Sequence, residues 1–231
     1  MRIVWAIGAM VWLALAGGVV AQERSAVVVE LYTSQGCSSC PPADALLQKL
    51  AQRNDVIALG LHVDYWDYIG WKDVFADHRF TLRQHGYAQA ANRRTVYTPQ
   101  MIIQGQAQVL GNHPKDVAMV IATYQDNPVQ VRLRLNREGG RLRIAGDGQA
   151  KGPLVVQMVT YEPEAITAIT RGENAGRTLS YTNVVRDWRI VGKWDGKGPF
   201  SMSAKAPANM PLAVIVQRAG FGRIVAAAQT K

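Results

Sequence analysis

The fold is decided around one stretch, Tyr32-Thr33-Ser34-Gln35-Gly36-Cys37-Ser38-Ser39-Cys40-Pro41-Pro42, which holds both cysteines of the 231-residue chain. An apolar run precedes this stretch, and an amphipathic helix pattern follows it. Two thiols separated by two residues at the start of a helix are able to close a small disulfide and to open it again. The unpaired N–H groups and the dipole at a helix N-terminus favour a thiolate over a thiol. The stretch therefore predicts a thiol–disulfide site.

Buried strands are predicted on both sides of that helix. Residues 26–32 and 56–63 are continuous apolar runs, which are typical of strands buried on both faces. A strand–helix–strand unit of this kind predicts two parallel strands joined by a right-handed connection. The remaining elements expected in the first half are a helix over about 77–91, strands over 100–105 and 107–110, and a helix that begins at Pro114.

This order of elements, with Cys-x-x-Cys after the first strand and Thr98-Pro99 before the third, resembles the thioredoxin fold. The segments 30–44, 62–67 and 97–100 together are similar to one family of secreted bacterial thioredoxin-like proteins catalogued as a domain of unknown function. The similarity extends to residues 171–177. The resemblance to the thioredoxin fold implies that Pro99 is cis and faces the disulfide, and that Thr98 contacts the backbone of a substrate. The similarity to the family of unknown function implies no particular substrate.

The second half reads differently. Its segments alternate between apolar and polar residues, and glycine-containing turns separate them, which predicts seven or eight short antiparallel strands. We therefore expect an α/β thioredoxin-like domain over 22–127, followed by an all-β immunoglobulin-like sandwich over 128–231.

The first 21 residues have the pattern of a secretory signal peptide. Arg2 precedes an apolar run over 3–20, and small residues lead to a cleavage site expected after Ala21. The alternative is an uncleaved membrane anchor. With cleavage, the mature protein is expected in the periplasm or outside the cell, where disulfides persist. A disulfide that closes so small a loop adds little stability, so the pair is better explained by reactivity.

The charge of the chain is concentrated in its second half. Residues 22–127 carry nine Lys and Arg against ten Asp and Glu, whereas residues 128–231 carry sixteen against seven. One explanation for this excess of Lys and Arg is contact with an anionic surface. The other is that these side chains cover the solvent-exposed faces of sheets and keep edge strands from pairing with other molecules. An exported location and the absence of a long basic run argue against nucleic acid as a partner. The sequence has no Gly-rich phosphate loop, and we expect no bound cofactor.

We predict that Cys37 is the nucleophile, because it comes first and should be the more exposed cysteine, and that Cys40 resolves the mixed disulfide. Glu30 lies in a buried strand shortly before the cysteines and is a candidate to accept the proton of Cys40; the alternative is a strand residue that reaches solvent or pairs with a lysine. Ser38 and Ser39 bring no positive charge between the cysteines, so a moderately oxidising pair is expected.

Three residues are candidates for binding a partner: Thr98, Pro99 and Trp66. Trp66 belongs to an aromatic segment, residues 65–71, which either forms a rim for an unfolded peptide or packs as a local core. A weaker alternative is a copper or zinc site formed by Cys37, Cys40 and His62.

The sequence thus favours an exported thiol–disulfide oxidoreductase that exchanges disulfides with protein or small-molecule thiols, with a membrane redox protein as a further possible partner. The alternatives are the metal-binding module and a non-catalytic binding protein. Neither the direction of exchange nor the substrate follows from the sequence.

Overall fold

The computed structural model describes residues 26–230. The predicted signal peptide, with its cleavage site after Ala21, lies outside the described residues. The elements are β1 (Val27–Thr33), α1 (Pro41–Ala51), β2 (Val56–His62), a 3-10 turn η1 (Asp67–Ile69), α2 (His78–Ala90), β3 (Gln100–Ile103), β4 (Ala107–Leu110), α3 (Pro114–Gln125), β5 (Val131–Glu138), β6 (Arg141–Gly148), β7 (Leu154–Ala168), β8 (Thr178–Trp194), β9 (Phe200–Lys205), β10 (Leu212–Arg218) and β11 (Ile224–Thr230).

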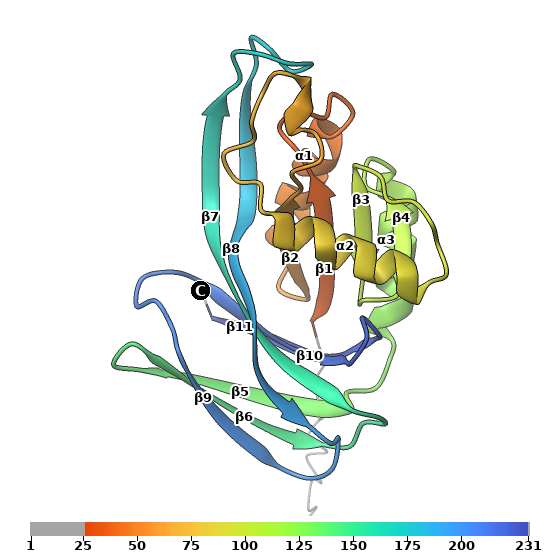
Figure 1. The fold of residues 1–231 in the computed structure, drawn as a ribbon. Helices are drawn as coiled ribbons and strands as arrows, with labels where there is room; N and C mark the ends of the chain where they lie inside the picture. The colour runs from red at the N-terminus through yellow and green to blue at the C-terminus, as the bar shows by residue number, and fades with distance from the viewer. Residues whose placement is uncertain (1–25, 231) are drawn as a thin grey trace, which may run out of the picture.

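One mixed sheet of eight strands, in the order β11-β10-β7-β8-β2-β1-β3-β4, draws on both halves of the chain (Figure 1). Strands β1 and β2 are parallel and paired from Val27↔Val56 to Thr33↔His62, which confirms the predicted strand–helix–strand unit. Strand β3 runs antiparallel to β1. The carboxyl ends of β1 and β2 therefore meet at one edge, and the cysteine loop follows β1 there.

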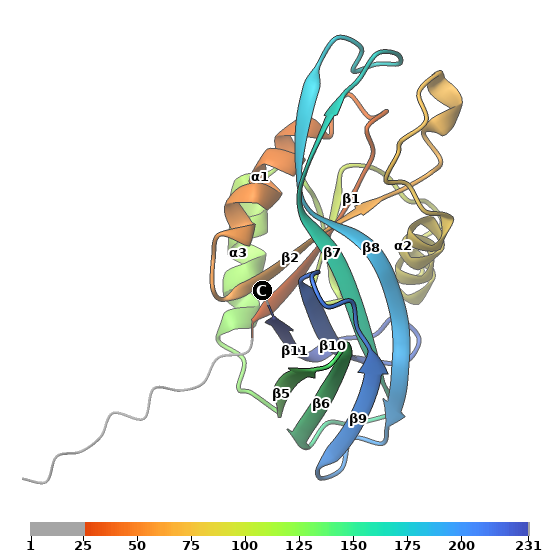
Figure 2. The same ribbon diagram turned by 90° about the vertical axis from the view of Figure 1, so that its left-hand side faces the viewer.

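Helices cover both faces of this sheet (Figure 2). Helices α1 and α3 pack on one face, where Leu47 and Ile121 join the apolar side chains of β1 that include Leu31. Helix α2 packs on the opposite face, through Phe80 and Tyr87. Because successive side chains of a strand point to opposite faces, Leu31 faces α1, whereas Glu30 and Tyr32 face α2.

Strands β7 and β8 form a long antiparallel pair that runs the height of the molecule (Figure 1). Near the middle of its length, β8 joins β2 in parallel through the pair Gly60↔Val184. At one end, the three-stranded sheet β5-β6-β9 packs over β7 and β10, with Leu142 and Ile144 against Val156 and Val214. The turn between β7 and β8 extends beyond the sheet to the start of α1.

The predicted fold class, an α/β thioredoxin-like domain followed by an immunoglobulin-like sandwich, is wrong. The second half does not close into a sandwich of its own, since β7, β8, β10 and β11 extend the sheet that β1 and β2 begin. Where the sequence predicts short strands, residues 178–194 form one continuous strand of 17 residues, β8, whose length allows it to reach β2. A pairing between strands so distant in sequence leaves no local pattern to detect.

The predicted domain boundary at residues 127 and 128 falls in the connection between α3 and β5, and the division into two domains there stays a prediction. Within the described part of the chain, no helix is long and apolar enough to cross a membrane.

Candidate functional site

Cys37 and Cys40 form a disulfide at the N-terminus of α1, with an S–S distance of 2.08 Å. Cys40 is the N-cap residue of the helix, and Pro41 and Pro42 follow it, at positions where the missing N–H of proline costs no helical hydrogen bond. The N–H of Cys40 donates to the carbonyl oxygen of Cys37 at 3.2 Å. We expected Cys37 to be the more exposed cysteine, but both cysteines are fully buried. Exposure therefore does not identify the nucleophile.

The turn before the disulfide packs against the aromatic segment. There is little room for a side chain at Gly36, because a Cβ atom at this position would lie 3.0 Å from Ile69 and 3.2 Å from Trp66. The N–H of Gly36 donates to the hydroxyl of Ser34 at 3.1 Å, which fixes the turn from within. A residue with a Cβ here would force Trp66 and Ile69 to move away from the cysteine loop by a few tenths of an ångström.

Trp66, Thr98 and Pro99 lie beside this loop. The indole Nε1 of Trp66 donates to Thr98 Oγ1 at 2.7 Å, and the Thr98–Pro99 peptide bond is cis, as the resemblance implied. Pro99 and Ala43 of α1 both lie within 3.2 Å of the position that a Cβ of Gly111 would take. The structure thus brings together the three residues predicted to bind a partner and the start of α1.

The other aromatic residues of the segment divide between packing and exposure. Tyr65 and Trp66 pack against the core beside α2, and Trp71 Nε1 donates to Gln35 Oε1 at 2.8 Å. Tyr68 is 82% exposed. The segment is therefore mostly a local core, with one aromatic side chain in solvent.

Glu30 lies on the other face of the sheet from α1, in a buried network of its own. Its carboxylate accepts hydrogen bonds from Arg83 Nε at 2.8 Å, from the Tyr87 hydroxyl at 2.7 Å and from the Tyr32 hydroxyl at 2.9 Å. The guanidinium of Arg83 also stacks 3.7 Å from the ring of Trp188. The structure does not bring Glu30 together with the cysteines. Glu30 forms a buried ion pair with Arg83, and not the contact with solvent or a lysine that the alternative interpretation expected.

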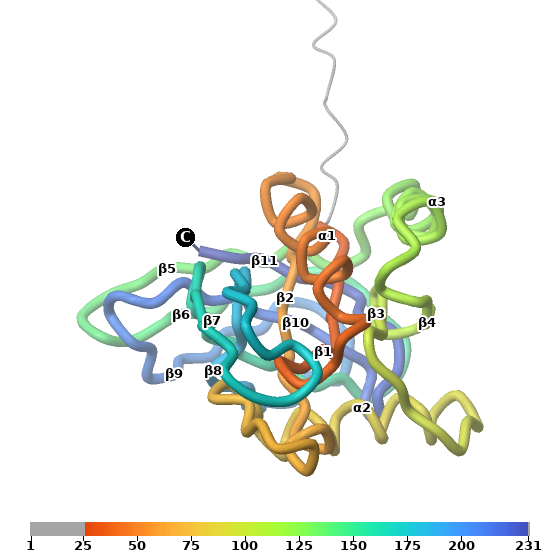
Figure 3. The backbone as a smooth tube through the Cα atoms, turned by 90° about the horizontal axis from the view of Figure 1, so that it is seen from above, coloured from red at the N-terminus to blue at the C-terminus, as the bar shows by residue number. Residues whose placement is uncertain are grey.

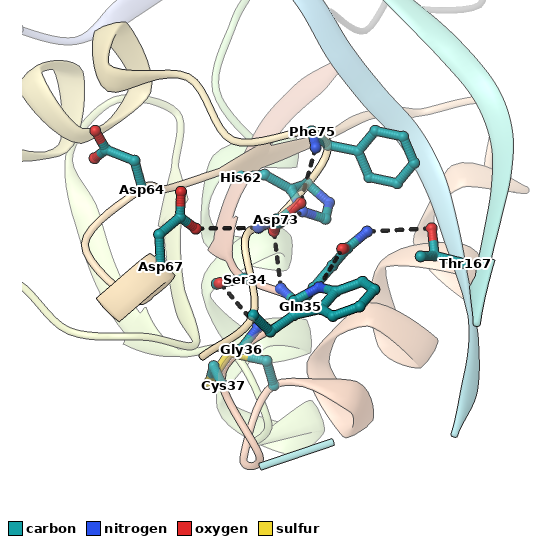
Figure 4. Close-up of polar contacts among 12 residues, drawn as sticks. Ser34, Gln35, Gly36, Cys37, His62, Asp64, Asp67, Asp73, Phe75 and Thr167 are labelled. Atoms are coloured by element: carbon teal, nitrogen blue, oxygen red, sulfur yellow. Dashed lines mark hydrogen bonds and ion pairs between the residues drawn. A yellow bond between two sulfur atoms is a disulfide. The ribbon is translucent and has the colours of Figure 1, made fainter. Parts of the chain in front are cut away.

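A second buried polar cluster does lie on the cysteine side of the sheet, and the sequence did not reveal it (Figure 4). Asp73 Oδ2 lies 2.7 Å from His62 Nδ1 and accepts from the N–H of Gln35 at 2.8 Å. Burial acts to raise the pKa of Asp73, but His62 and the hydrogen bonds from the N–H groups of Gln35 and Phe75 act together in the other direction, and the pKa is lowered. Asp73 therefore ties the end of β2 to the residue that starts the cysteine turn.

Asp44 belongs to the same cluster. It lies in the first turn of α1, where its N–H donates to the carbonyl oxygen of Cys40 at 3.1 Å, and it is 6% exposed. Burial raises the pKa of Asp44 to about 7, although His62 acts in the opposite direction. Residues four apart lie on one face of a helix, so the side chain of Asp44 follows that of Cys40 on the buried face.

The turn between β7 and β8 reaches the cysteine loop from the second half of the chain. Asn174 Nδ2 donates to the carbonyl oxygens of Gln35 and Cys37, each at 3.0 Å, and Glu173 Oε2 accepts from the N–H of Ser38 at 3.1 Å. Figure 3, seen from above, shows this turn beside the loop that follows β1. In the sequence, residues 171–177 were noted only for their similarity to the family, and no role was predicted for Glu173 or Asn174.

His62 is engaged by Asp73, and its ring also meets those of Phe75 and Tyr181 edge-on, at centroid distances of 5.3 and 4.8 Å. Within residues 26–230, no group of three or more His, Cys, Asp or Glu side chains is arranged to hold a metal ion.

One family model and two solved structures are similar to this chain. The model of a family described as a protein of unknown function, DUF1223, matches residues 28–217. The crystal structure of a protein from Agrobacterium tumefaciens is 34% identical, with a TM-score of 0.79, over 90% of this chain and 95% of that one. HBP35 of Porphyromonas gingivalis, 14% identical over 90% of this chain and 75% of that one, has a TM-score of 0.59 and shares the fold. No curated protein matches the chain. The match over most of its length shows that this chain belongs to the DUF1223 family.

Proposed function

We propose that this protein is an exported thiol–disulfide oxidoreductase that exchanges disulfides with protein or small-molecule thiols through Cys37 and Cys40. One observation carries the proposal: the two cysteines close a disulfide across only two intervening residues at the N-terminus of α1. Such a disulfide adds little to stability, and a helix N-terminus favours the thiolate that exchange requires.

In the reducing direction, the thiolate of Cys37 attacks one sulfur of a partner disulfide, forms a mixed disulfide and releases the first partner thiolate, which takes up a proton. Cys40 then loses its proton and attacks Cys37 Sγ, which releases the second partner thiolate. The protein disulfide forms, the partner disulfide is reduced, and two electrons and two protons pass to the partner. The oxidising direction is the reverse.

Asp44 is better placed than Glu30 to handle the proton of Cys40. It follows Cys40 by one helical turn on the buried face, whereas Glu30 is saturated by Arg83, Tyr32 and Tyr87 on the other face. With a pKa raised by burial to about 7, Asp44 is able both to accept and to give a proton near neutral pH.

A partner would bind beside Thr98, Pro99 and Trp66. Because both cysteines are fully buried, the partner reaches Cys37 Sγ only after part of the surrounding loop moves. The exposed side chains of Ser38 and Ser39 lie over the pair and are the first that a partner meets.

The basic second half supports a weaker proposal, contact with an anionic surface or with a membrane redox protein. Strands β5 and β6 alternate buried apolar residues with exposed arginines at 132, 134, 141 and 143. The exposed face of the three-stranded sheet is therefore positively charged.

The proposed exchange is tested with Cys40→Ser, which leaves Cys37 free to attack and removes the resolving thiol. We expect this variant to hold a mixed disulfide with a model disulfide peptide, while Cys37→Ser, the matched control, forms none. A Cys40→Ser protein that forms no mixed disulfide, together with a wild-type protein that does not catalyse peptide disulfide exchange, would refute the function.

A further inference from the structure

Asn174 holds the β7–β8 turn on the cysteine loop. It is 1% exposed, and its amide nitrogen donates to the carbonyl oxygens on both sides of Gly36, those of Gln35 and Cys37. Its Oδ1 accepts from Arg177 Nη1 at 2.9 Å. Both ends of this buried amide are thus engaged, which fixes the neighbouring residue, Glu173, relative to the disulfide.

Glu173 places a carboxylate on the peptide group that directly follows Cys37. Its Oε2 accepts from the N–H of Ser38 at 3.1 Å. Hydrogen bonding from Ser38, by its hydroxyl and then by its backbone N–H, lowers the pKa of Glu173. The carboxylate is therefore an anion at neutral pH.

This contact opposes the usual effect of a helix N-terminus on a cysteine pair. Free N–H groups there stabilise a thiolate, and a stabilised thiolate favours the dithiol and makes the disulfide a stronger oxidant. Glu173 instead accepts from the N–H of Ser38, just before the helix, and so places a negative charge on the peptide group that follows Cys37. A nearby like charge disfavours the charged form of an acid.

We propose that Glu173, positioned by Asn174, stabilises the Cys37–Cys40 disulfide relative to the dithiol, so that the pair reduces partner disulfides rather than oxidising partner thiols. The disulfide is then a weaker oxidant than the moderately oxidising pair that we predicted from Ser38 and Ser39. The direction of exchange rests on the proposed function, whereas the effect on the disulfide is a property of the chain itself.

The equilibrium with glutathione tests this directly, because one protein disulfide and two glutathione thiols give one protein dithiol and one glutathione disulfide. Glu173→Gln keeps the hydrogen-bond acceptor and removes the charge. We expect it to shift the equilibrium towards the dithiol by about threefold to tenfold, which corresponds to ~15–30 mV at 29.6 mV per tenfold change. High salt should reduce this shift, since Glu173 is exposed.

Two matched variants separate the local effect from a general loss of charge. Glu164→Gln removes the same charge from an exposed position on β7 and should leave the equilibrium unchanged. Glu173→Asp keeps the charge and should stay closer to the wild type than Glu173→Gln does. Asn174→Ala should shift the equilibrium in the same direction as Glu173→Gln, because it releases Glu173; if it does not fold, Glu173→Gln alone decides.

A second measurement follows the pH dependence of alkylation of the reduced protein. The midpoint for Cys37 should fall in Glu173→Gln, an effect that a purely structural role would not produce. The inference is overturned if Glu173→Gln and Glu164→Gln have the same equilibrium and the same midpoint. The glutathione equilibrium remains measurable even if the wild-type protein catalyses no exchange with a disulfide peptide, so the two proposals fail separately.

Discussion

Asn174 donates a hydrogen bond to the carbonyl oxygen of Cys37 at 3.0 Å across a separation of 137 residues. The same amide group also holds the carbonyl oxygen of Gln35. The loop that carries the first cysteine is therefore shaped by a residue of the second half as much as by its own turn.

Asn174→Ala should lower the free energy of unfolding by about 1–3 kcal/mol, because it leaves the buried carbonyl oxygen of Gln35 without this donor. Urea denaturation of the oxidised protein measures the loss. Asn136→Ala, at an exposed position on β5, is the control and should change stability by less than about 0.5 kcal/mol. Equal losses in the two variants would contradict the structural role of Asn174.

Asp44→Asn should stabilise the protein at alkaline pH. A carboxyl group whose pKa is raised on folding contributes stability below its unfolded pKa, and that contribution is lost as pH rises through the folded pKa, here from about 4 to about 7. The wild type should lose up to about 4 kcal/mol over this range, because one pH unit between the two pKa values corresponds to about 1.36 kcal/mol. Denaturation at a series of pH values should show a flatter curve for Asp44→Asn, and curves of equal slope would contradict the raised pKa.

Glu30→Gln should destabilise the protein by about 3–5 kcal/mol, because it removes the charge that Arg83 is paired with in the core. The glutathione equilibrium of Cys37 and Cys40 should not change, since Glu30 lies on the opposite face of the sheet. Replacement of both partners, Glu30→Gln with Arg83→Met, should recover part of the stability. A changed pH profile of exchange in Glu30→Gln would restore the proton-accepting role predicted from the sequence.

Trp66→Phe should weaken binding of a disulfide peptide without changing the redox equilibrium. The substitution keeps an aromatic side chain, with its Cβ beside Gly36, but removes the indole N–H that donates to Thr98. The loss of one hydrogen bond of about 1 kcal/mol corresponds to a rise in KM of roughly fivefold. Steady-state kinetics with a fluorescent peptide measure this rise, and Tyr68→Phe, at the exposed position of the same segment, is the control. An unchanged KM would remove Trp66 from the proposed partner site.

The sequence predicted those elements whose evidence is local. The apolar run of β1, the face of α1 and the run of β2 are periodic patterns, and their parallel pairing follows from the connection between them. The strands of the second half were also detected. Their assembly was not, because β8 meets β2 through Gly60 and Val184, which no short-range pattern relates.

The candidate site divides in the same way. The cysteines and Thr98-Pro99 were found by motif, whereas Asp44 was missed because an acidic residue in the first turn of a helix ordinarily serves the helix dipole at the surface. Its charged neighbours, His62 and Asp73, come from other elements. Glu30 was chosen as a proton acceptor because a charged residue stands out in a buried strand. Its partner, Arg83, lies on a helix 53 residues away, and no local pattern connects the two.

The position of β8 beside β2 determines what a shortened chain would be. A fragment that ends at residue 127 would leave β2 as an open edge strand, with unpaired backbone groups available to a second molecule. It would also lose Glu173 and Asn174, so its cysteines would lack the contacts that hold their loop. Self-association and intermolecular disulfides, rather than a simpler active unit, are the expected properties of such a fragment.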